Sequence, residues 1–183
     1  MKIYTKKGDQ GFTTNIKGEK ISKGDLMIEL QGSIDEVNAG VGYLRSICNK
    51  MLTSTQKLEI DQNLKDIQHT LFRIGGDVTY QFAQLYVKEE DLQALEKGID
   101  SMTEKTGELK NFIYYSGHVA STYCQVLRSV TRRAERVFVR AIEGQYEATL
   151  DYQYMNRLAD YFFTLGRYLN LLEGEVEEVM KLK

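Results

Sequence analysis

Proline is absent from this sequence of 183 residues, and cysteine occurs only twice. Proline interrupts helices and is common in the turns of large β proteins, so its absence favours long helices over an all-β fold. Two cysteines, Cys48 and Cys124, exclude a disulfide scaffold and are simplest to explain in a reducing cytoplasm. No run of apolar residues approaches 18, and the first eleven residues lack the apolar stretch of a secretory signal, so neither a membrane partner nor export is predicted.

Neither sign of charge is in excess. The sequence has 24 basic and 26 acidic residues, for a net charge of −2, which argues against a protein that coats nucleic acid. Hydrophobic residues at 42% and charged residues at 27% exclude a disordered or fibrous chain. A chain of this length suits a single domain, 1–183, and buries roughly 70% of its unfolded surface without a metal or disulfide. We divide it into an arm (1–24), a helical bundle (25–172) and an acidic tail (173–183).

The arm is rich in glycine and lysine and carries only two acidic residues, Asp9 and Glu19, so its local charge is +4. Between Thr5 and Thr14, glycines and hydroxyls alternate with lysines, and such turns can aim backbone N–H groups at an anion. Lys20 and Lys23 follow and could reach further oxygens. No P-loop or dinucleotide-binding glycine motif occurs. The alternative interpretation of the arm is a flexible basic terminus.

After the arm, apolar residues recur at steps of three and four, which is typical of one helix face. Five such stripes run over residues 34–48, 64–78, 92–102, 119–141 and 155–172. They predict an all-α fold, an antiparallel five-helix bundle with short connections. In the fourth stripe we expect the core residues Val119, Tyr123, Val126, Val130, Val137 and Ala141. We expect Cys48 and Cys124 in or near the core, and the acidic stretch Glu173–Glu178 to fray in solvent.

The densest polar feature is the run from Arg128 to Arg136, which reads RSVTRRAER. Arg128, Arg132 and Glu135 lie at i, i+4 and i+7 and so share one helix face. Guanidinium groups offer paired donors that suit phosphate oxygens, which favours an anion site here. The alternative is a solvated charged face with ion pairs inside the helix.

Two shorter segments also carry polar residues beside apolar stripes. Asp35 and Asn38 lie one turn apart, and Asp35 could pair with an arginine from another helix or subunit. Asn156 and Asp160 share a face at i, i+4. Both histidines, His69 and His118, are isolated, which disfavours a metal site. No Ser/His/Asp or Cys/His arrangement for nucleophilic catalysis can be proposed.

Together and in this order, these features resemble the PduO-type ATP:corrinoid adenosyltransferases, also called ATP:cob(I)alamin adenosyltransferases. The matching segments cover nearly the whole chain and are IYTKKGDQG at 3–11, GSIDEVN at 32–38, LFRIGGD at 71–77, FIYYSG at 112–117, RSVTRRAER at 128–136 and NRLADYFF at 156–163. The chain departs from the family pattern in three places. Lys7 replaces the usual threonine, the segment from Asp25 lacks the usual Asp-Pro-Arg-Val, and Tyr114-Tyr-Ser precedes Gly117.

The resemblance implies a ferritin-like five-helix bundle that assembles as a homotrimer, with active sites between subunits. It also implies transfer of the 5′-deoxyadenosyl group from ATP to the cobalt of cob(I)alamin, with release of triphosphate and formation of adenosylcobalamin. Mg²⁺ would accompany ATP, and we assign no metal ligand firmly. The residues expected to bind ATP are Thr5, Lys6, Lys7, Gly8, Thr13, Thr14, Lys23, Arg132, Glu135, Arg136 and Asn156.

The same resemblance implies a corrinoid-facing group made of Asp35, Phe112 and Arg128, which with Arg132 are the expected catalytic residues. Cob(I)alamin is itself a strong nucleophile, so no protein nucleophile is needed. Arg132, with Lys6 and Lys23, would stabilise the charge on the leaving triphosphate. Asp35 paired with Arg128 would fix the corrinoid-facing wall. Phe112 would exclude the lower axial ligand of cobalt, which makes reduction of Co(II) easier.

Two other functions stay open on the sequence alone. The protein could carry adenosylcobalamin to a client enzyme without making it, in which case it would bind corrinoid without releasing triphosphate. The arginine helix could instead bind nucleic acid, although the net charge and the lack of a nucleic-acid motif argue against that partner. An adenosyltransferase would also depend on a corrinoid reductase and on a client enzyme that uses adenosylcobalamin.

Overall fold

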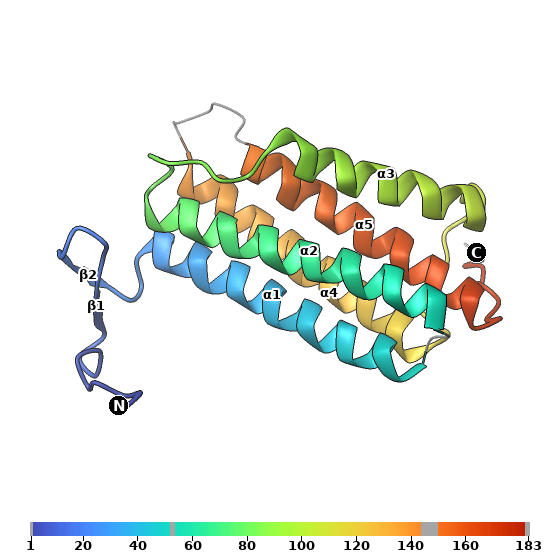
Figure 1. The fold of residues 1–183 in the computed structure, drawn as a ribbon, viewed down its shortest axis with the longest axis horizontal. Coiled ribbons are helices and arrows are strands. Elements are labelled where there is room, and N and C mark those ends of the chain that lie inside the picture. The colour runs from blue at the N-terminus through green and yellow to red at the C-terminus, as the bar shows by residue number, and fades with distance from the viewer. Residues whose placement is uncertain (1, 52–53, 144–149, 182–183) are drawn as a thin grey trace.

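The protein is an antiparallel bundle of five helices preceded by a short β-hairpin (Figure 1). The computed structural model describes residues 2–51, 54–143 and 150–181. The strands are β1 (Phe12–Thr14) and β2 (Lys20–Ser22), and the helices are α1 (Leu26–Met51), α2 (Ser54–Thr79), α3 (Glu89–Thr106), α4 (Val119–Ala141) and α5 (Leu150–Leu172). The predicted all-α five-helix fold is confirmed. Within the described ranges, no helix has the length and apolar character that crossing a membrane requires.

The helices pack in the spatial order α2, α1, α4, α5, α3, so α3 covers the outer side of α5. In α1, α2, α3 and α5 the helix buries the stripe that the sequence spacing indicated. In α1, Leu30, Ile34, Val37, Val41 and Leu44 are at most 2% exposed. Burial of each such side chain contributes roughly 1.5–3 kcal/mol, which is why this stripe fixes the orientation of the helix.

The stripe predicted for α4 is partly wrong. Val119 and Val126 are 55% and 53% exposed, whereas Leu127 and Phe138 are almost fully buried. Apolar side chains occupy two adjacent faces of α4, and the buried face is the one that also carries small residues, Ala120, Cys124, Thr131 and Ala134. Small residues let α1 and α5 pack closely against α4. The spacing of apolar residues alone does not reveal this close packing. Of the other predicted core residues, Val137 is buried, and Tyr123, Val130 and Ala141 are half-buried.

Both cysteines lie in the core, as predicted. Burial raises the pKa of Cys48 to about 11 and also raises the pKa of Cys124. The two thiols therefore stay protonated at neutral pH and act as small core residues rather than as nucleophiles.

Two buried carboxyl groups meet where α2 packs near the start of α5. Asp77 is fully buried, and its two carboxylate oxygens accept hydrogen bonds from the backbone N–H of Tyr86 at 3.0 Å. Asp151 is 1% exposed and faces Asp77. Burial and then the charge of Asp77 raise the pKa of Asp151 to about 7, so Asp151 holds a proton below that pH.

The acidic tail does not fray, contrary to the prediction. After Gly174, which has a positive φ of 71°, the chain turns back along the bundle. Glu177 forms an ion pair with Arg167 of α5, and Val179 forms an antiparallel bridge with Ile113. The prediction rested on the acidic composition of the segment. Composition does not reveal that a buried arginine, distant from most of these acids in sequence, forms an ion pair with one of them.

Candidate functional site

The arm gathers most of its predicted ATP-binding residues around one open depression. Two glycines with positive φ, Gly11 at 79° and Gly18 at 81°, allow the turns that form the hairpin. The N–H of Lys23 then donates to the carbonyl of Gly11 at 2.9 Å, which draws the end of the arm back to its start. The resulting depression has a volume of about 540 Å³ and is lined by Thr5, Lys7, Gly8, Phe12, Thr13, Thr14, Lys20 and Lys23.

The electrostatic character of this depression is cationic. Three lysines line it, and none of its lining residues is acidic. Lys23 lies across Gly8, because a Cβ atom on that glycine would come within 2.6 Å of the lysine Nζ. The glycine leaves room for the ammonium group to lie over the backbone, and a larger residue would displace the flexible end of the lysine from that position. Hydroxyls, lysines and exposed backbone at one place suit a polyphosphate. Lys6 is not among the lining residues.

On α4, two arginines stand out because their guanidinium groups form neither an ion pair nor a hydrogen bond with any of the described residues. Arg133 pairs with Glu36 at 2.5 Å, and Arg140 pairs with Glu29 at 3.0 Å, both acids being on α1. Arg132 and Arg136 are exposed and form no such pair. The described structure shows no ion pair inside the 128–136 run, so the intrahelical pairs of the alternative interpretation are not seen, while the exposed arginines fit either a solvated face or an anion site.

The face of α4 that carries Arg132 continues onto α5. The hydroxyl of Tyr152 donates to Glu135 at 3.4 Å, and the Arg128 guanidinium lies 5.8 Å from the ring centre of Phe163. These two contacts fix the antiparallel register of α4 and α5. Asn156 lies one turn after Tyr152 on the same face, so its exposed amide stands alongside the stretch from Arg132 to Glu135.

Arg128 belongs to a different neighbourhood from Arg132. Its Nε donates to Gln125 at 3.2 Å, and its Nη2 donates to the hydroxyl of Tyr115 at 2.5 Å. Its guanidinium also lies 5.2 Å from the Tyr115 ring centre. Tyr115 belongs to the α3–α4 connection that contains Phe112, whose side chain is 71% exposed. Phe112 is therefore not a core residue, and Arg128 marks the end of the α4 face that adjoins it.

Asp35 does not pair with Arg128 within the chain. It lines a groove of about 610 Å³ between α1 and α2, together with Gly32, Phe72 and Gly75. α1 packs against both α2 and α4. The predicted Asp35–Arg128 pair is not formed within the described part of the chain, where Arg128 bonds to Gln125 and Tyr115 instead.

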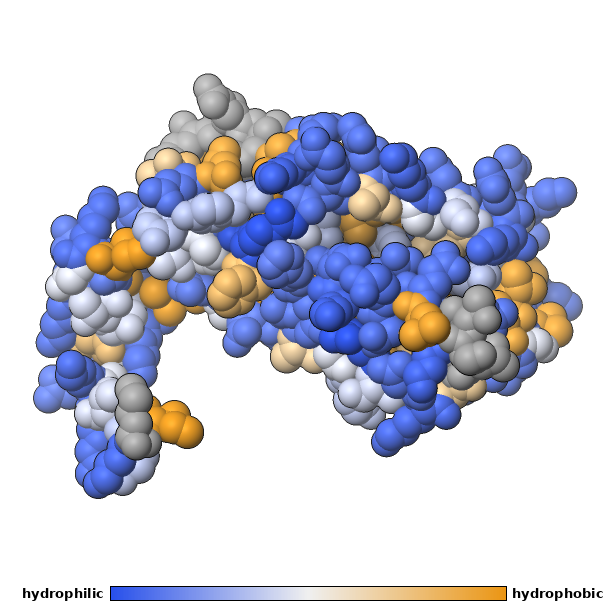
Figure 2. All heavy atoms as spheres, in the orientation of Figure 1, coloured by the Kyte–Doolittle hydropathy of each residue, from blue (hydrophilic) through white to orange (hydrophobic). Residues whose placement is uncertain are grey.

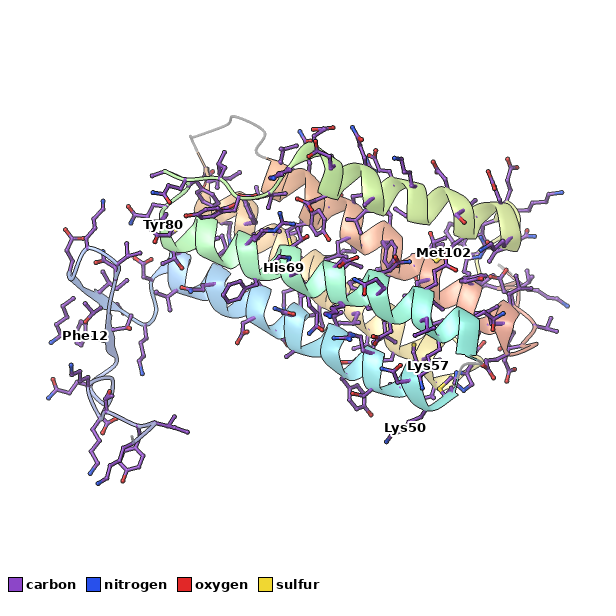
Figure 3. The ribbon with its side chains drawn as sticks, in the orientation of Figure 1. Phe12, Lys50, Lys57, His69, Tyr80 and Met102 are labelled. Atoms are coloured by element: carbon purple, nitrogen blue, oxygen red, sulfur yellow. The ribbon has the colours of Figure 1, made fainter. Side chains whose placement is uncertain are left out.

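The predicted site residues thus fall into separate groups. Figure 1 shows the hairpin projecting beyond the start of α1, whereas the connection carrying Phe112 lies at the other end of the bundle. In Figure 2 the arm is a distinct lobe with open space between it and the bundle. Figure 3 shows Phe12 on that lobe, well away from the helices, and His69 midway along α2. No cluster of three potential metal-ligating side chains (His, Cys, Asp or Glu) occurs in the described part of the chain.

Sequence reasoning did not single out three residues that shape these neighbourhoods: Tyr115, Tyr152 and Phe163. Tyr115 lies where the sequence departs from the family pattern, and Phe163 is the last residue of the matching segment 156–163. Their positions in the sequence therefore gave some indication that they lie near the site. Tyr152 precedes that segment by four residues. Its contact with Glu135 depends on the register between α4 and α5, and no local sequence pattern predicts that register.

Comparisons with known proteins agree on one family. Residues 3–169 match the family model described as Cobalamin adenosyltransferase. The corrinoid adenosyltransferase of Bacillus subtilis is 35% identical and aligns with 95% of this chain and 89% of its own length. Corrinoid adenosyltransferase MMAB of Homo sapiens is 34% identical over 97% of this chain and 72% of its own length.

Solved structures show the same similarity. A phenylalanine-to-alanine variant of a PduO-type ATP:corrinoid adenosyltransferase from Lactobacillus reuteri, complexed with cobalamin and ATP, superposes with a TM-score of 0.87 at 32% identity. The match covers 99% of this chain and 100% of that one. An arginine-to-lysine variant from the same organism, complexed with ATP, gives a TM-score of 0.85 at 32% identity, over 98% of this chain and 100% of that one.

Proposed function

The chain belongs to the cobalamin adenosyltransferase family and is a corrinoid adenosyltransferase that uses ATP, and from this premise we propose how its own residues carry out the reaction. The observation that carries the proposal is the exposed α4–α5 face, where Arg132 and Arg136, which form no ion pair with the described residues, lie beside Glu135 and Asn156. Free guanidinium groups next to a carboxylate and an amide can hold a nucleotide by its phosphates and orient it by its polar edges.

The two substrates lie in sequence along α4. Arg128 adjoins the Phe112 connection, and Arg136 is two turns further toward the hairpin end of the bundle, a span of roughly 12 Å. We assign the corrinoid to the Arg128 end and the ATP phosphates to the Arg132–Arg136 stretch. C5′ of ATP then meets cobalt between the two ends, which is the positioning that this displacement requires.

In the reaction, the electron pair of Co(I) forms the bond to C5′ while the bond from C5′ to the triphosphate oxygen breaks. Negative charge therefore grows on the triphosphate. Arg132 and Lys23 are placed to stabilise that charge, with Arg136 and the other arm lysines, Lys6 and Lys7, binding the remaining phosphate oxygens. No described residue needs to act as a nucleophile or base, which agrees with the protonated core thiols.

Mg²⁺ enters as part of the Mg–ATP substrate. Magnesium in such sites keeps several waters and is bound through substrate phosphates with one or two carboxylates. The residues present fit this role, because Glu135 offers one partly exposed carboxylate beside the two arginines. Bound there, Mg²⁺ would neutralise part of the triphosphate charge.

Phe112 supplies an exposed ring at the corrinoid-facing end, where we propose that it occupies the lower side of cobalt and keeps the axial ligand away. Phe112 is 71% exposed, so its ring is accessible to a large ligand such as the corrinoid.

The complete site requires more than one chain, and we propose a homotrimer. The arm projects from the bundle that carries the α4–α5 face, and Asp35 lines the α1–α2 groove without contacting Arg128 within the described chain. A head-to-tail ring brings the α1–α2 groove and arm of one subunit against the α4–α5 face of the next, and repeats the same contact around the ring. Asp35 and Arg128 would then pair across each interface.

Two cellular partners follow from the chemistry. Co(I) has to be generated, so we expect a corrinoid reductase to act with the protein in a reducing cytoplasm. Adenosylcobalamin has to be used, so we also expect a client enzyme that depends on it. Neither partner is required for the central test.

That test mixes the protein with Mg–ATP and chemically reduced cobalamin. We expect the visible spectrum of adenosylcobalamin to develop and one triphosphate to be released per corrinoid converted. Binding of corrinoid without triphosphate release would instead identify a carrier, and would overturn the proposal.

A further inference from the structure

Phe112 is held through its backbone rather than through its ring. Its side chain is 71% exposed and is not part of the hydrophobic core. Side-chain packing therefore does not fix where the ring stands. If the ring acts by occupying one side of the corrinoid, as proposed above, whatever fixes the backbone of residues 107–118 also fixes the geometry of the reaction.

The middle of this connection is paired with the tail. The N–H of Met180 donates to the carbonyl of Phe112 at 2.7 Å, and the N–H of Tyr114 donates to the carbonyl of Glu178 at 2.9 Å. These bonds frame the antiparallel bridge between Ile113 and Val179. The tail thus acts as a short strand laid against the residue before and the residue after Ile113.

The tail is in turn fixed to α5 by a buried arginine. The Arg167 side chain is 6% exposed, and its Nε and Nη2 donate to the two carboxylate oxygens of Glu177 at 2.6 and 3.2 Å. The same guanidinium donates to the carbonyls of Gly107 at 3.1 Å and Thr106 at 3.4 Å, where α3 ends and the connection begins. One arginine therefore ties the start of the connection to the strand that holds its middle.

The far end of the connection is fixed one turn further along α5. The Asn170 amide donates to the carbonyl of Ser116 at 3.0 Å and accepts from the N–H of His118 at 3.0 Å. Gly117 lies directly on this amide with a φ of 96°, and a Cβ atom there would come within 2.5 Å of the Asn170 oxygen. Both hydrogen-bonding atoms of the amide are used on the connection.

We infer that Arg167, acting through Glu177, and Asn170 are positioning residues for Phe112 in the adenosyl transfer. They lie at i, i+3 on one turn of α5 and hold the start, middle and end of the connection. This inference rests on the proposed role of Phe112. Its physical basis is that a bidentate, charge-assisted pair has a defined direction as well as strength, so it sets the place of the tail strand and not only its attachment.

The test uses Glu177→Gln, which keeps the shape of the side chain but removes its charge. The matched control is Glu178→Gln, one residue along, where the side chain has no hydrogen bond among the described residues. The readout is the electron paramagnetic resonance spectrum of Co(II) cobalamin bound with Mg–ATP, which separates four-coordinate from five-coordinate cobalt. A loss of general stability would not by itself change that ratio in the folded protein.

For Glu177→Gln we expect the five-coordinate fraction to increase at least twofold. We also expect adenosylation that starts from Co(II) with a reductant to slow about tenfold. The reaction of preformed Co(I) should change less than twofold. Glu178→Gln should match the wild type. Met180→Pro, which deletes the N–H that donates to Phe112, should reproduce the Glu177→Gln spectrum without altering the bundle.

The outcomes separate the inference from its premise. If Phe112→Ala raises the five-coordinate fraction but Glu177→Gln and Met180→Pro do not, the positioning role is overturned and the role of Phe112 stands. If Phe112→Ala leaves the four-coordinate signal unchanged, the premise fails, and with it the inference. If the wild type produces no adenosylcobalamin from Co(I) and Mg–ATP, the proposed function itself is wrong.

Discussion

At the scale of single residues, the surroundings of Arg132 are the ones that most clearly favour a role in binding ATP. The acids of α1 pair with the neighbouring Arg133 and Arg140, whereas Arg132 has no ion-pair partner in the part of the chain that the structure describes. We expect Arg132→Ala to raise the KM for ATP and lower kcat together. Loss of a hydrogen bond to a charged group costs roughly 1.5–3 kcal/mol, or about 10- to 150-fold in kcat/KM.

Steady-state kinetics with preformed Co(I) measure this effect. Arg140→Ala is the matched control, because it removes an equally exposed arginine whose partner is a surface acid, and surface pairs contribute little. Equal kinetics for Arg132→Ala and Arg140→Ala would remove Arg132 from the site.

The buried carboxyl pair predicts a dependence of stability on pH. The pKa of Asp151 is about 7 in the folded protein and 3.8 as its ordinary value, so the folded state holds a proton that the unfolded state has lost. Its stabilising contribution is complete below pH 4 and is lost as pH rises toward 7. Asp151→Asn keeps the shape of the neutral side chain without titrating, so its advantage over wild type should grow by up to about 3 kcal/mol between pH 5 and 8.

Urea unfolding at the two pH values checks this sign. Asp61→Asn is the control, because hydrogen bonding to Arg45 lowers the pKa of Asp61 and its contribution is lost only in acid. Identical pH slopes for wild type and Asp151→Asn would show that the proton is not held there.

At the scale of elements, the contact between α1 and α4 depends on one missing side chain. A Cβ atom at Gly40 would lie 2.5 Å from Leu127 Cδ2 and 3.2 Å from the Tyr123 hydroxyl. Gly40→Ala should therefore push the helices apart and destabilise the protein by about 1–3 kcal/mol, despite the better helix propensity of alanine.

Thermal unfolding tests this against Gly76→Ala in α2. There the added Cβ would meet its nearest neighbour, the Tyr86 ring, at 3.8 Å, which is ordinary contact. Gly76→Ala should gain stability from helix propensity, by roughly 0.5–1 kcal/mol. A stabilised Gly40→Ala protein would contradict the close approach.

The elements themselves were predictable from the sequence, and their pairings were less so. Three- and four-residue spacing identified α1, α2, α3 and α5 because one apolar face dominates each. It misplaced the face of α4, where Val126 is exposed and Leu127 buried, because apolar residues occur on both sides. The order of the tail was not predicted for a related reason. Glu177 is held by its ion pair with Arg167, ten residues earlier, and no local sequence pattern indicates that pair. The family resemblance, rather than spacing, supplied Phe112 and the ATP-binding role of Asn156, although spacing had already singled out Asn156 as a polar residue beside the apolar stripe.

At the scale of the whole molecule, the separation of the arm from the α4–α5 face predicts sites shared between chains. Light scattering should give a mass near three chains. A sharper test mixes Lys23→Ala with Arg132→Ala, each of which damages a different half of every site. Random reassembly of a head-to-tail ring leaves about a quarter of the interfaces with both halves intact, so activity should return on mixing.

Refolding the two variants together, and each variant alone, supplies the comparison. Recovery only in the mixture supports shared sites. A fully active monomer, or no recovery in mixed assemblies that light scattering shows to have formed, would contradict them.

The pairing of the tail with the Phe112 connection also orders events during synthesis. When residues 107–118 leave the ribosome, Asn170, Glu177 and Met180 have not yet been made. The α1–α2 hairpin can collapse early through contacts between neighbouring segments, whereas the connection waits for partners about sixty residues later. It should be the last segment to become ordered and the first to open. We expect the amide protons of Tyr114 and Met180 to exchange with solvent well before those of α1, even though each is hydrogen-bonded in the folded state.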